Sequence, residues 1–205
     1  MRNAPTILVL LLLVATATAF AVTQRLKLEP SPISQTHVDK VFSPACGCVT
    51  NAAHIDFSIR HADHLRIWVR TPSGPEVIAD REFPKGMVHV RWDGHGVPDG
   101  TYFAVVHLQR AQRTIDLPNP IRVDTVPPTI TLVSMHTVNG KTRFVYRASE
   151  RAHALLYVNG RRAVRTYSTN RHGKFDWYGD HGQQRLALAA EDLAGNRSEP
   201  VPVSH

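Results

Sequence analysis

After residue 50, apolar and polar side chains alternate along the chain with a period of two. The alternation runs through residues 55–60, 64–70 and 87–92, and turn sequences such as TPSGP, FPKG and DGHGVPDG separate these segments. A period of two predicts a β-strand with one buried and one exposed face, and no window shows a competing helical period. The residues expected to face inward are Ile55, Phe57, Ile59, Leu65, Ile67, Val69, Val88, Val90 and Trp92. Short strands at roughly ten-residue spacing predict an all-β sandwich.

The segment VHVRWDGHGVPDGTYFAVV, residues 88–106, joins two alternating runs by a glycine-rich loop. Its Asp-Gly pairs favour the positive backbone angles that tight turns need. The sequence therefore predicts a hairpin at the rim of a sandwich, with two aromatic rings closing its end. A sugar-stacking role for these rings is the alternative. The residues that define the hairpin are Trp92, Asp93, Gly94, Asp99, Gly100 and Tyr102, and Ala104, Val106 and Leu108 continue the inward face of the return strand.

The second half of the chain repeats the pattern of the first. FSIRHADHLRIWVRTPSG at 57–74 aligns with FVYRASERAHALLYVNG at 144–160, and each copy predicts a strand, a small polar turn and a second strand. A repeat of about 87 residues corresponds to one Ig-sized module. The prolines of DTVPPT, residues 124–129, exclude a central strand or a helix interior and mark a boundary. The expected organisation is a linker at 24–36 and two tandem Ig-like β-sandwich domains at 37–123 and 124–205.

Two motifs of the first domain point to a family. V-x-W-D-G, a glycine-rich loop and V-P-D-G-T-Y follow one another, and Val41-Phe42-Ser43-Pro44 precedes them. Residues 38–123 thereby resemble the FlgD-type Ig-like domain, which is named for the flagellar hook-capping protein and occurs on bacterial surface proteins. That family usually has an acidic Asn-Gly-Asp-Gly loop where this chain has Ala45-Cys46-Gly47-Cys48, so the resemblance does not extend to an ion-binding role of the loop. The rest of a hook-capping protein is missing, so no flagellar function is implied.

The second domain is similar to bacterial Ig-like repeats. DTVPPTI at 124–130 looks like their opening linker, and AEDLAGNRS at 190–198 looks like their closing turn. Antibody-type Ig domains differ, because they join their two sheets with cysteines that lie far apart in the sequence. Both cysteines of this chain are near neighbours, so we expect apolar packing to hold the sheets together.

An uncharged apolar run at 7–22, ILVLLLLVATATAFAV, follows Arg2 near the N-terminus. About 16 residues suit the core of a signal peptide and are slightly short for a membrane-spanning helix. Small residues near the end of the run fit cleavage, whereas Arg25 and Lys27 would flank the outer end of an uncleaved span. Residues 1–23 are therefore expected to be a signal peptide or a signal anchor, and both alternatives export the rest of the chain.

The two cysteines, Cys46 and Cys48, are separated by one residue. An exported chain meets oxidising conditions, and an even number of cysteines favours pairing. A bridge over one residue closes a small ring, and Gly47 makes the required bend easier. A local disulfide is the expectation, with free thiols or a metal site as alternatives.

Charge is distributed unevenly between the two halves. The chain carries a net charge of +7, and while residues 34–124 are neutral, residues 125–205 contain eleven Lys and Arg against six Asp and Glu. The excess is concentrated at 159–179, where basic and aromatic residues are interleaved as in surfaces that hold anionic polymers. A solvated hairpin whose charges serve solubility is the alternative. The candidate patch consists of Arg161, Arg162, Arg165, Arg171, Lys174, Tyr167 and Trp177.

The sequence predicts no catalytic residue, metal or cofactor. No serine lies in a strand–turn–helix context, and the 12 histidines, His61 and His64 among them, lack the converging ligands that zinc needs. Asp124, Asp192 and Asn196 are placed like the calcium ligands between tandem extracellular modules. The same side chains can instead stabilise a turn by bonding to their own backbone.

These features predict a non-catalytic, exported module of the bacterial envelope or cell surface that binds or spaces. The expected partners are another envelope protein or an anionic wall polymer, and the membrane if the N-terminal segment stays uncleaved; nucleic acid is not expected. The expected location is the outer side of the cytoplasmic membrane, or the medium if the segment is cleaved. A structural stalk without a ligand and an enzyme are the alternatives, because sandwiches of this kind host many functions.

Overall fold

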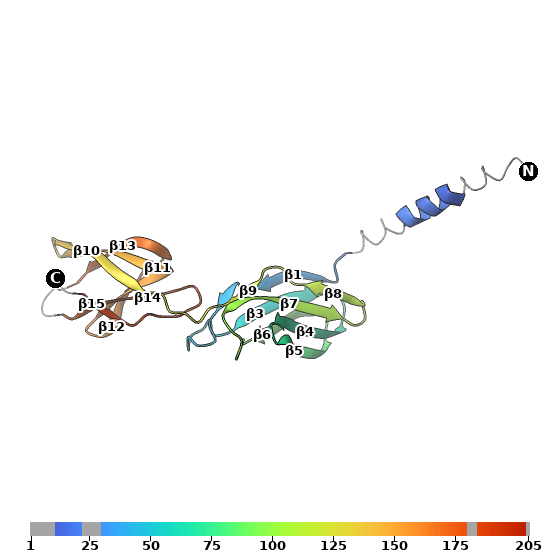
Figure 1. Ribbon diagram of the computed structural model, residues 1–205, viewed down its shortest axis with the longest axis horizontal. Helices are drawn as coiled ribbons and strands as arrows, with labels where there is room; N and C mark the ends of the chain where they lie inside the picture. Colours follow the sequence, from blue (N-terminus) through green and yellow to red (C-terminus); the bar gives the residue numbers. More distant parts are fainter. Residues whose placement is uncertain (1–10, 22–29, 180–183, 204–205) are drawn as a thin grey trace, which may run out of the picture.

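The computed structural model describes residues 11–21, 30–179 and 184–203. Apart from a helix at 11–21, the regular structure consists of strands, which form two sandwiches that lie end to end (Figure 1). The predicted all-β fold is confirmed. In the described part of the chain, no helix has the length and apolar character needed to cross a membrane. The other residues of the predicted N-terminal segment, and residues 24–29 of the predicted linker, lie outside the described residues.

The first domain is built from two sheets. The smaller sheet has the order β1–β3–β6, and the larger has the order β2–β9–β7–β4–β5 with β8 pairing with β7. Neighbouring strands are antiparallel except for β2 and β9, which run parallel. The strands are Ile33–Val38 (β1), Val41–Phe42 (β2), Ala53–Ile59 (β3), Asp63–Thr71 (β4), Gly74–Phe83 (β5), Gly86–Trp92 (β6), Gly100–Leu108 (β7), Arg113–Asp116 (β8) and Ile121–Val123 (β9).

The second domain is organised around one long strand, β11. The first part of β11 pairs with β10 and β13, the second part pairs with β12 and β14, and β15 extends the sheet beyond β14. Asn-Gly pairs at 139–140 and 159–160 join β11 to β10 and β12, and all four residues have a positive φ. Such pairs suit two-residue hairpins of the twist that strands prefer. The strands are Ile130–Val138 (β10), Lys141–Val158 (β11), Arg161–Arg165 (β12), Asn170–Tyr178 (β13), Leu186–Glu191 (β14) and Val201–Val203 (β15).

Each domain has its own apolar core. The residues predicted to face inward in the first domain are buried, with the exception of Val90, which is half-buried. Two edge-to-face contacts, each 5.3 Å between ring centroids, join Trp92 to Phe42 and to Tyr102. Trp92 and Tyr102 thus close one end of the first core, as predicted.

The predicted hairpin at 88–106 is wrong. β6 pairs with β3, while β7 pairs with β4, β8 and β9, so the glycine-rich loop crosses from one sheet to the other. Local turn chemistry did not distinguish the two topologies, because a loop of seven residues can join strands within one sheet or across the sandwich. Gly94 has the expected positive φ of 58°, whereas Gly100 does not have the positive φ that was expected for it.

The predicted turn in the second copy of the repeat is also wrong. In the first domain, residues 60–62 separate β3 from β4, and the two strands belong to different sheets. The equivalent residues of the second domain lie within β11, where the pairing with β13 shifts its register between Arg147 and Ala152. One irregular strand therefore changes sheets where the first domain uses two strands and a turn.

The first strand begins inside the segment predicted as a linker. β1 starts at Ile33 and pairs with β3, with Ile33 opposite Ile59 and Val38 opposite Ile55. Ile33 and Val38 are buried in the first core. The predicted boundary at residue 36 was too late, because two prolines and polar residues masked a strand with only two inward-facing apolar positions.

Candidate functional site: the junction between the domains

Three segments converge where the two domains meet. The loop between β2 and β3 comes from the first domain, residues 124–129 connect the domains, and the turn at 192–197 follows β14. Asp99 also reaches the connection, since its carboxylate accepts hydrogen bonds from the backbone N–H and the hydroxyl of Thr125 at 3.0 and 2.9 Å. The connection is thus held to the first domain beyond the covalent chain.

The loop between β2 and β3 carries the cysteine pair. A disulfide joins Cys46 to Cys48, and Gly47 between them has a φ of 59°. The Cys48 Sγ lies 3.0 Å from the hydroxyl of Thr50, and this hydroxyl donates a hydrogen bond of 2.7 Å to the carbonyl of Ala194 in the second domain. The disulfide loop is therefore part of the contact surface between the domains.

Gly195 allows the two loops to approach closely. A Cβ at this position would lie 2.4 Å from the Cys48 Sγ and 2.5 Å from the Thr50 Oγ1. Its φ of 92° is also one that other residues rarely adopt. Both the space and the backbone geometry at this position call for glycine.

Asn196 links the closing turn to the connection. Its amide Nδ2 donates to the carbonyl of Asp124 and to the carboxylate of Asp192, both at 2.8 Å. Its backbone N–H donates to the other oxygen of Asp192 at 2.9 Å. Asn196 and Asp192 are each only 4% exposed, so these bonds are shielded from water. The predicted turn role of Asp192 and Asn196 is therefore present, and it extends across the junction.

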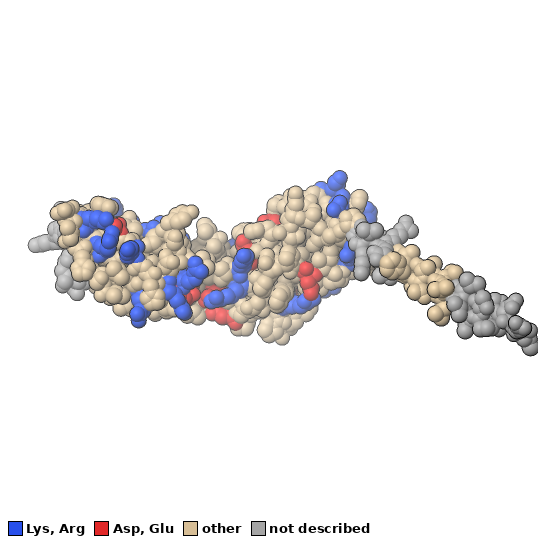
Figure 2. All heavy atoms as spheres, turned by 90° about the horizontal axis from the view of Figure 1, so that it is seen from above, with Lys and Arg blue, Asp and Glu red and all other residues tan. Residues whose placement is uncertain are grey.

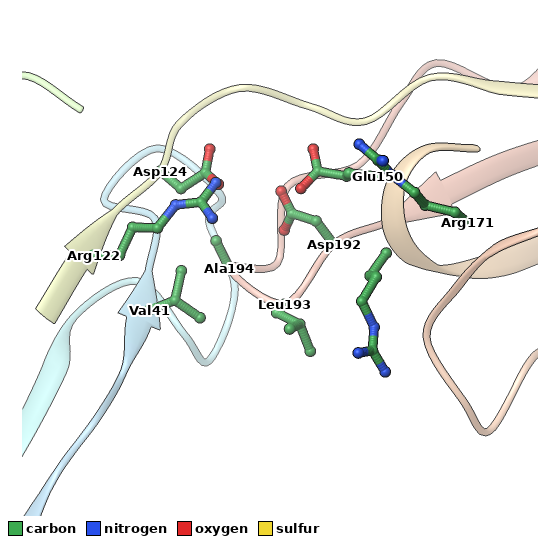
Figure 3. A pocket seen from close by; sticks show the side chains of 9 residues that line it. Val41, Arg122, Asp124, Glu150, Arg171, Asp192, Leu193 and Ala194 are labelled. Atoms are coloured by element: carbon green, nitrogen blue, oxygen red, sulfur yellow. The ribbon is translucent and has the colours of Figure 1, made fainter. Parts of the chain in front are cut away.

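Three carboxylates point toward one another beside these bonds (Figure 3). Ligand atoms of Asp124, Glu150 and Asp192 all lie within 4.8 Å of one another. They line a pocket of about 400 Å³, to which Arg122 and Arg171 also contribute. Arg122 forms an ion pair with Asp124.

Two of the three carboxyl groups, Glu150 and Asp192, have a raised pKa. Burial, followed by the nearby charges of Asp124 and Asp192, raises the pKa of Glu150 above its usual value. Burial also raises the pKa of Asp192, although hydrogen bonds from Asn196 oppose this effect. Glu150 therefore lies in a position where its negative charge is unfavourable.

The cluster has the oxygen ligands that a calcium ion prefers, but two of its members are already engaged. Asp124 accepts from Arg122 and from the backbone N–H of Val126, and Asp192 accepts from Asn196. The amide of Asn196 is engaged through its nitrogen, whereas calcium binds oxygen atoms and takes six or more of them. In this arrangement each aspartate carboxylate stabilises its own segment, and the amide of Asn196 joins the two segments.

The basic and aromatic residues predicted to form one patch do not lie on one hairpin. Arg161, Arg162 and Arg165 belong to β12, which pairs with the second part of β11, whereas Lys174 and Trp177 belong to β13, which pairs with the first part. Figure 2 shows the basic side chains of this face in separate groups. Basic and aromatic residues are interleaved in the sequence, but the fold places them on different strands, which pair with different parts of β11.

Several members of the predicted patch also have other roles. Arg165 forms an ion pair with Glu191 at 2.9 Å, and Arg171 lines the pocket at the junction. Trp177 is only 9% exposed and belongs to the second core. Arg161, Arg162, Lys174 and Tyr167 remain exposed.

The sequence analysis missed three residues of the junction. Glu150 was placed in a turn, Thr50 had no motif, and Gly195 was noted only as part of a closing turn. Of these, only the Ala194-Gly195-Asn196 segment carried a local signal, namely a turn next to acidic residues. The other two acquire their roles by contact with residues far away in the sequence.

No protein-family model matches the chain, and no curated protein matches it. Solved structures with some similarity include the fibronectin(III)-like modules of Clostridium thermocellum CbhA, with 16% identity, a TM-score of 0.45 and coverage of 82% of this chain and 92% of that one. The human OSCAR ligand-binding domain has 10% identity, a TM-score of 0.39 and coverage of 84% and 96%. The Salmonella enterica SafA pilin in complex with the SafB chaperone has 11% identity, a TM-score of 0.30 and coverage of 84% and 96%. Similarities of this size assign the chain to no family.

Proposed function

We propose that this chain is an exported, non-catalytic spacer of the cell envelope. In this proposal the N-terminal apolar segment attaches the chain to a membrane, and the two Ig-like domains stand in one orientation on its outer side. The observation that carries the proposal is the fastened junction. A spacer must keep its two ends at a defined separation. The contacts around Asn196, Thr50 and Asp99 restrict movement between the two domains, which would otherwise change that separation.

The connection between the domains also favours a stiff spacer. Pro127 and Pro128 lie in the middle of residues 124–129, and consecutive prolines stiffen a linker because the ring fixes φ. The disulfide between Cys46 and Cys48 fits the same proposal, since disulfides persist in the oxidising compartments outside the cytoplasm. The FlgD-type resemblance and an envelope-protein partner stay predictions. An anionic wall polymer also stays a prediction, without the continuous basic patch on which it was based.

The spacer proposal is tested by measuring residual dipolar couplings on residues 24–205. One alignment tensor for both domains is expected if the junction is fastened. Two independent tensors would contradict a spacer of fixed length. The Asn196→Ala variant removes both bonds of the amide and should separate the tensors. Gln109→Ala, a change at an exposed loop residue of the first domain without a positive φ, should not.

Export and attachment are tested in cells that express the full chain. Protease added to intact spheroplasts should degrade the two domains, and the full-length chain should remain with the membrane fraction after a salt wash. Domains that resist the protease until the cells are lysed would contradict export. A chain found only in the medium would contradict attachment and leave a secreted module.

A further inference from the structure

The end of the first domain opposite the junction collects three loops from both sheets. In β1, β3 and β6, the register places Ile33 opposite Ile59, and Ile59 opposite Gly86. In the other sheet, Leu65 lies opposite Leu108. Residues 60–62, 84–85 and 109–112 therefore meet at the end where the chain enters the domain. We call these loops, together with Arg113, the entry face.

Four basic side chains of the entry face are exposed: Arg60, Lys85, Arg110 and Arg113. Within the described residues, no ion pair is recorded for any of the four. Arg60 donates its Nε–H to the carbonyl of Ser31 at 2.9 Å, which keeps its guanidinium at this end. Figure 2 shows basic side chains gathered near the point where the N-terminal segment leaves the first domain.

Three acidic residues lie near the entry face, and two of them, Asp63 and Glu82, line a pocket with Gln109 and Arg110. Asp63 is only 6% exposed, and its carboxylate accepts hydrogen bonds from the backbone N–H groups of Arg110 and Ala111 at 2.7 and 3.4 Å. Asp80 contacts His64 at 2.7 Å, and Glu82 lies 3.7 Å from the other nitrogen of the same ring. The four exposed basic side chains outnumber the two exposed carboxylates of Asp80 and Glu82, so this end has an excess of positive charge.

The position of the entry face along the chain favours a lipid surface as its partner. The apolar run ends at Val22 and the described domain begins at Pro30, and eight residues of chain reach at most about 28 Å. A face tethered this close to a membrane meets its headgroups at a high effective concentration. Clusters of Lys and Arg next to a membrane segment bind anionic lipids, because each basic group adds a favourable electrostatic contribution.

We propose that the entry face rests on anionic lipid headgroups of the membrane to which the N-terminal segment attaches. This inference rests on the attachment in the proposed function. The contact would set the angle at which the spacer stands, since four basic groups on three loops and the start of β8 define a plane rather than a point. Binding would weaken with added salt, because exposed charges are screened.

The test uses the full chain in nanodiscs of phosphatidylcholine alone and in nanodiscs with about one third phosphatidylglycerol. Hydrogen–deuterium exchange is followed by mass spectrometry at low and high salt. Amide exchange in residues 60–62, 84–85 and 109–113 should slow by about five-fold or more with the anionic lipid at low salt, and high salt should remove this protection. The Lys85→Gln/Arg110→Gln/Arg113→Gln variant should lose the protection.

A matched control changes the same number of charges at the other end of the molecule. Arg161→Gln/Arg162→Gln/Lys174→Gln should keep the lipid-dependent protection of the entry face. Equal exchange in both lipids, or protection that persists in the variant of the entry face, would overturn the inference while the chain stays in the nanodisc. A chain that leaves both kinds of nanodisc would contradict the proposed attachment, and the inference would fall with it.

Discussion

The two domains have similar strand patterns but differ in the size of their apolar cores. Among the described residues, the first core contains 20 buried apolar residues, including the ring cluster of Phe42, Trp92 and Tyr102. The second core contains 11, of which four are alanines. Alanine buries little apolar surface, so the second core contributes less hydrophobic stabilisation than the first.

Both domains have ion pairs, but among the described residues only the second has carboxylates that each contact two Lys or Arg side chains. Glu191 lies between Arg165 and Arg197, and Asp176 contacts Lys141 and Arg143 at 2.7 and 2.8 Å. Hydrogen bonds from Arg143 and Lys141 hold the pKa of Asp176 well below its usual range. A similar strand pattern can therefore be kept with apolar cores of different size and with carboxylates that are paired differently.

The largest expected effect comes from removing the central ring of the first core. Trp92→Ala should lower the free energy of unfolding of the first domain by about 3–5 kcal/mol, because it leaves a cavity between Phe42 and Tyr102. Differential scanning calorimetry should show the first domain melting earlier and the second domain nearly unchanged. Trp92→Phe keeps a ring but loses the hydrogen bond to Glu76, and should cost less. Equal destabilisation of both domains would contradict independent cores.

The second domain should respond most to the loss of a paired carboxylate. Although burial opposes its ionisation, hydrogen bonds from Arg197 and Arg165 hold the pKa of Glu191 below its usual value. Glu191→Gln should therefore cost the second domain about 1.5–3 kcal/mol at neutral pH, measured by urea unfolding. The exposed Glu199→Gln is the control and should change stability by less than about 0.5 kcal/mol.

The loss of unfolding free energy caused by Glu191→Gln should depend on pH. A carboxyl whose pKa is lower in the folded state stabilises fully above its unfolded pKa of about 4.3, and this contribution is lost as the pH falls through the folded pKa. The difference between wild type and Glu191→Gln should therefore shrink in acid. A difference that stays constant down to acid pH would point to packing rather than charge.

The contact between the domains is probed by Gly195→Ala. The added methyl group would collide with Cys48 and Thr50 unless the loops move apart, and the positive φ should cost about 1–3 kcal/mol in either case. We expect the loops to separate, so that residual dipolar couplings give two alignment tensors. Gly160→Ala has a similar φ of 80° but open space around the new Cβ, so it isolates the backbone strain. If both variants keep one tensor, close approach at Gly195 does not hold the domains.

The smallest expected effect is a gain of stability at the junction. Glu150→Gln removes a charge that burial and two neighbouring carboxylates disfavour, and should raise stability at neutral pH by less than about 1 kcal/mol. Because the pKa of Glu150 is raised in the folded state, this destabilisation is absent in acid and appears as the pH rises through the folded pKa. The variant should therefore differ from wild type at pH 7 and converge with it in acid, by thermal melting. A loss of stability at pH 7 would mean that Glu150 has a favourable partner.

The alternation of apolar and polar residues correctly predicted buried side chains of the first domain. Ile55, Phe57 and Ile59 face the core as predicted, because a strand with one apolar edge has only one favourable orientation. Trp92 and Tyr102 do contact each other, but across the two sheets and not in the predicted hairpin. The pattern did not reveal which sheet receives each strand, and so it led to a hairpin at 88–106 that the structure lacks.

The sequence by itself determined an all-β chain with two Ig-sized units and the faces that their strands bury, because these follow from local alternation and turn residues. Only the tertiary structure decided that the basic residues of 159–179 separate onto different strands, and that Thr50, Glu150 and Gly195 meet at the junction. Those outcomes depend on strand pairing and on contacts between residues up to 144 positions apart, such as Thr50 and Ala194. Local propensity carries no information about such contacts, since they form only when both domains are folded and brought together.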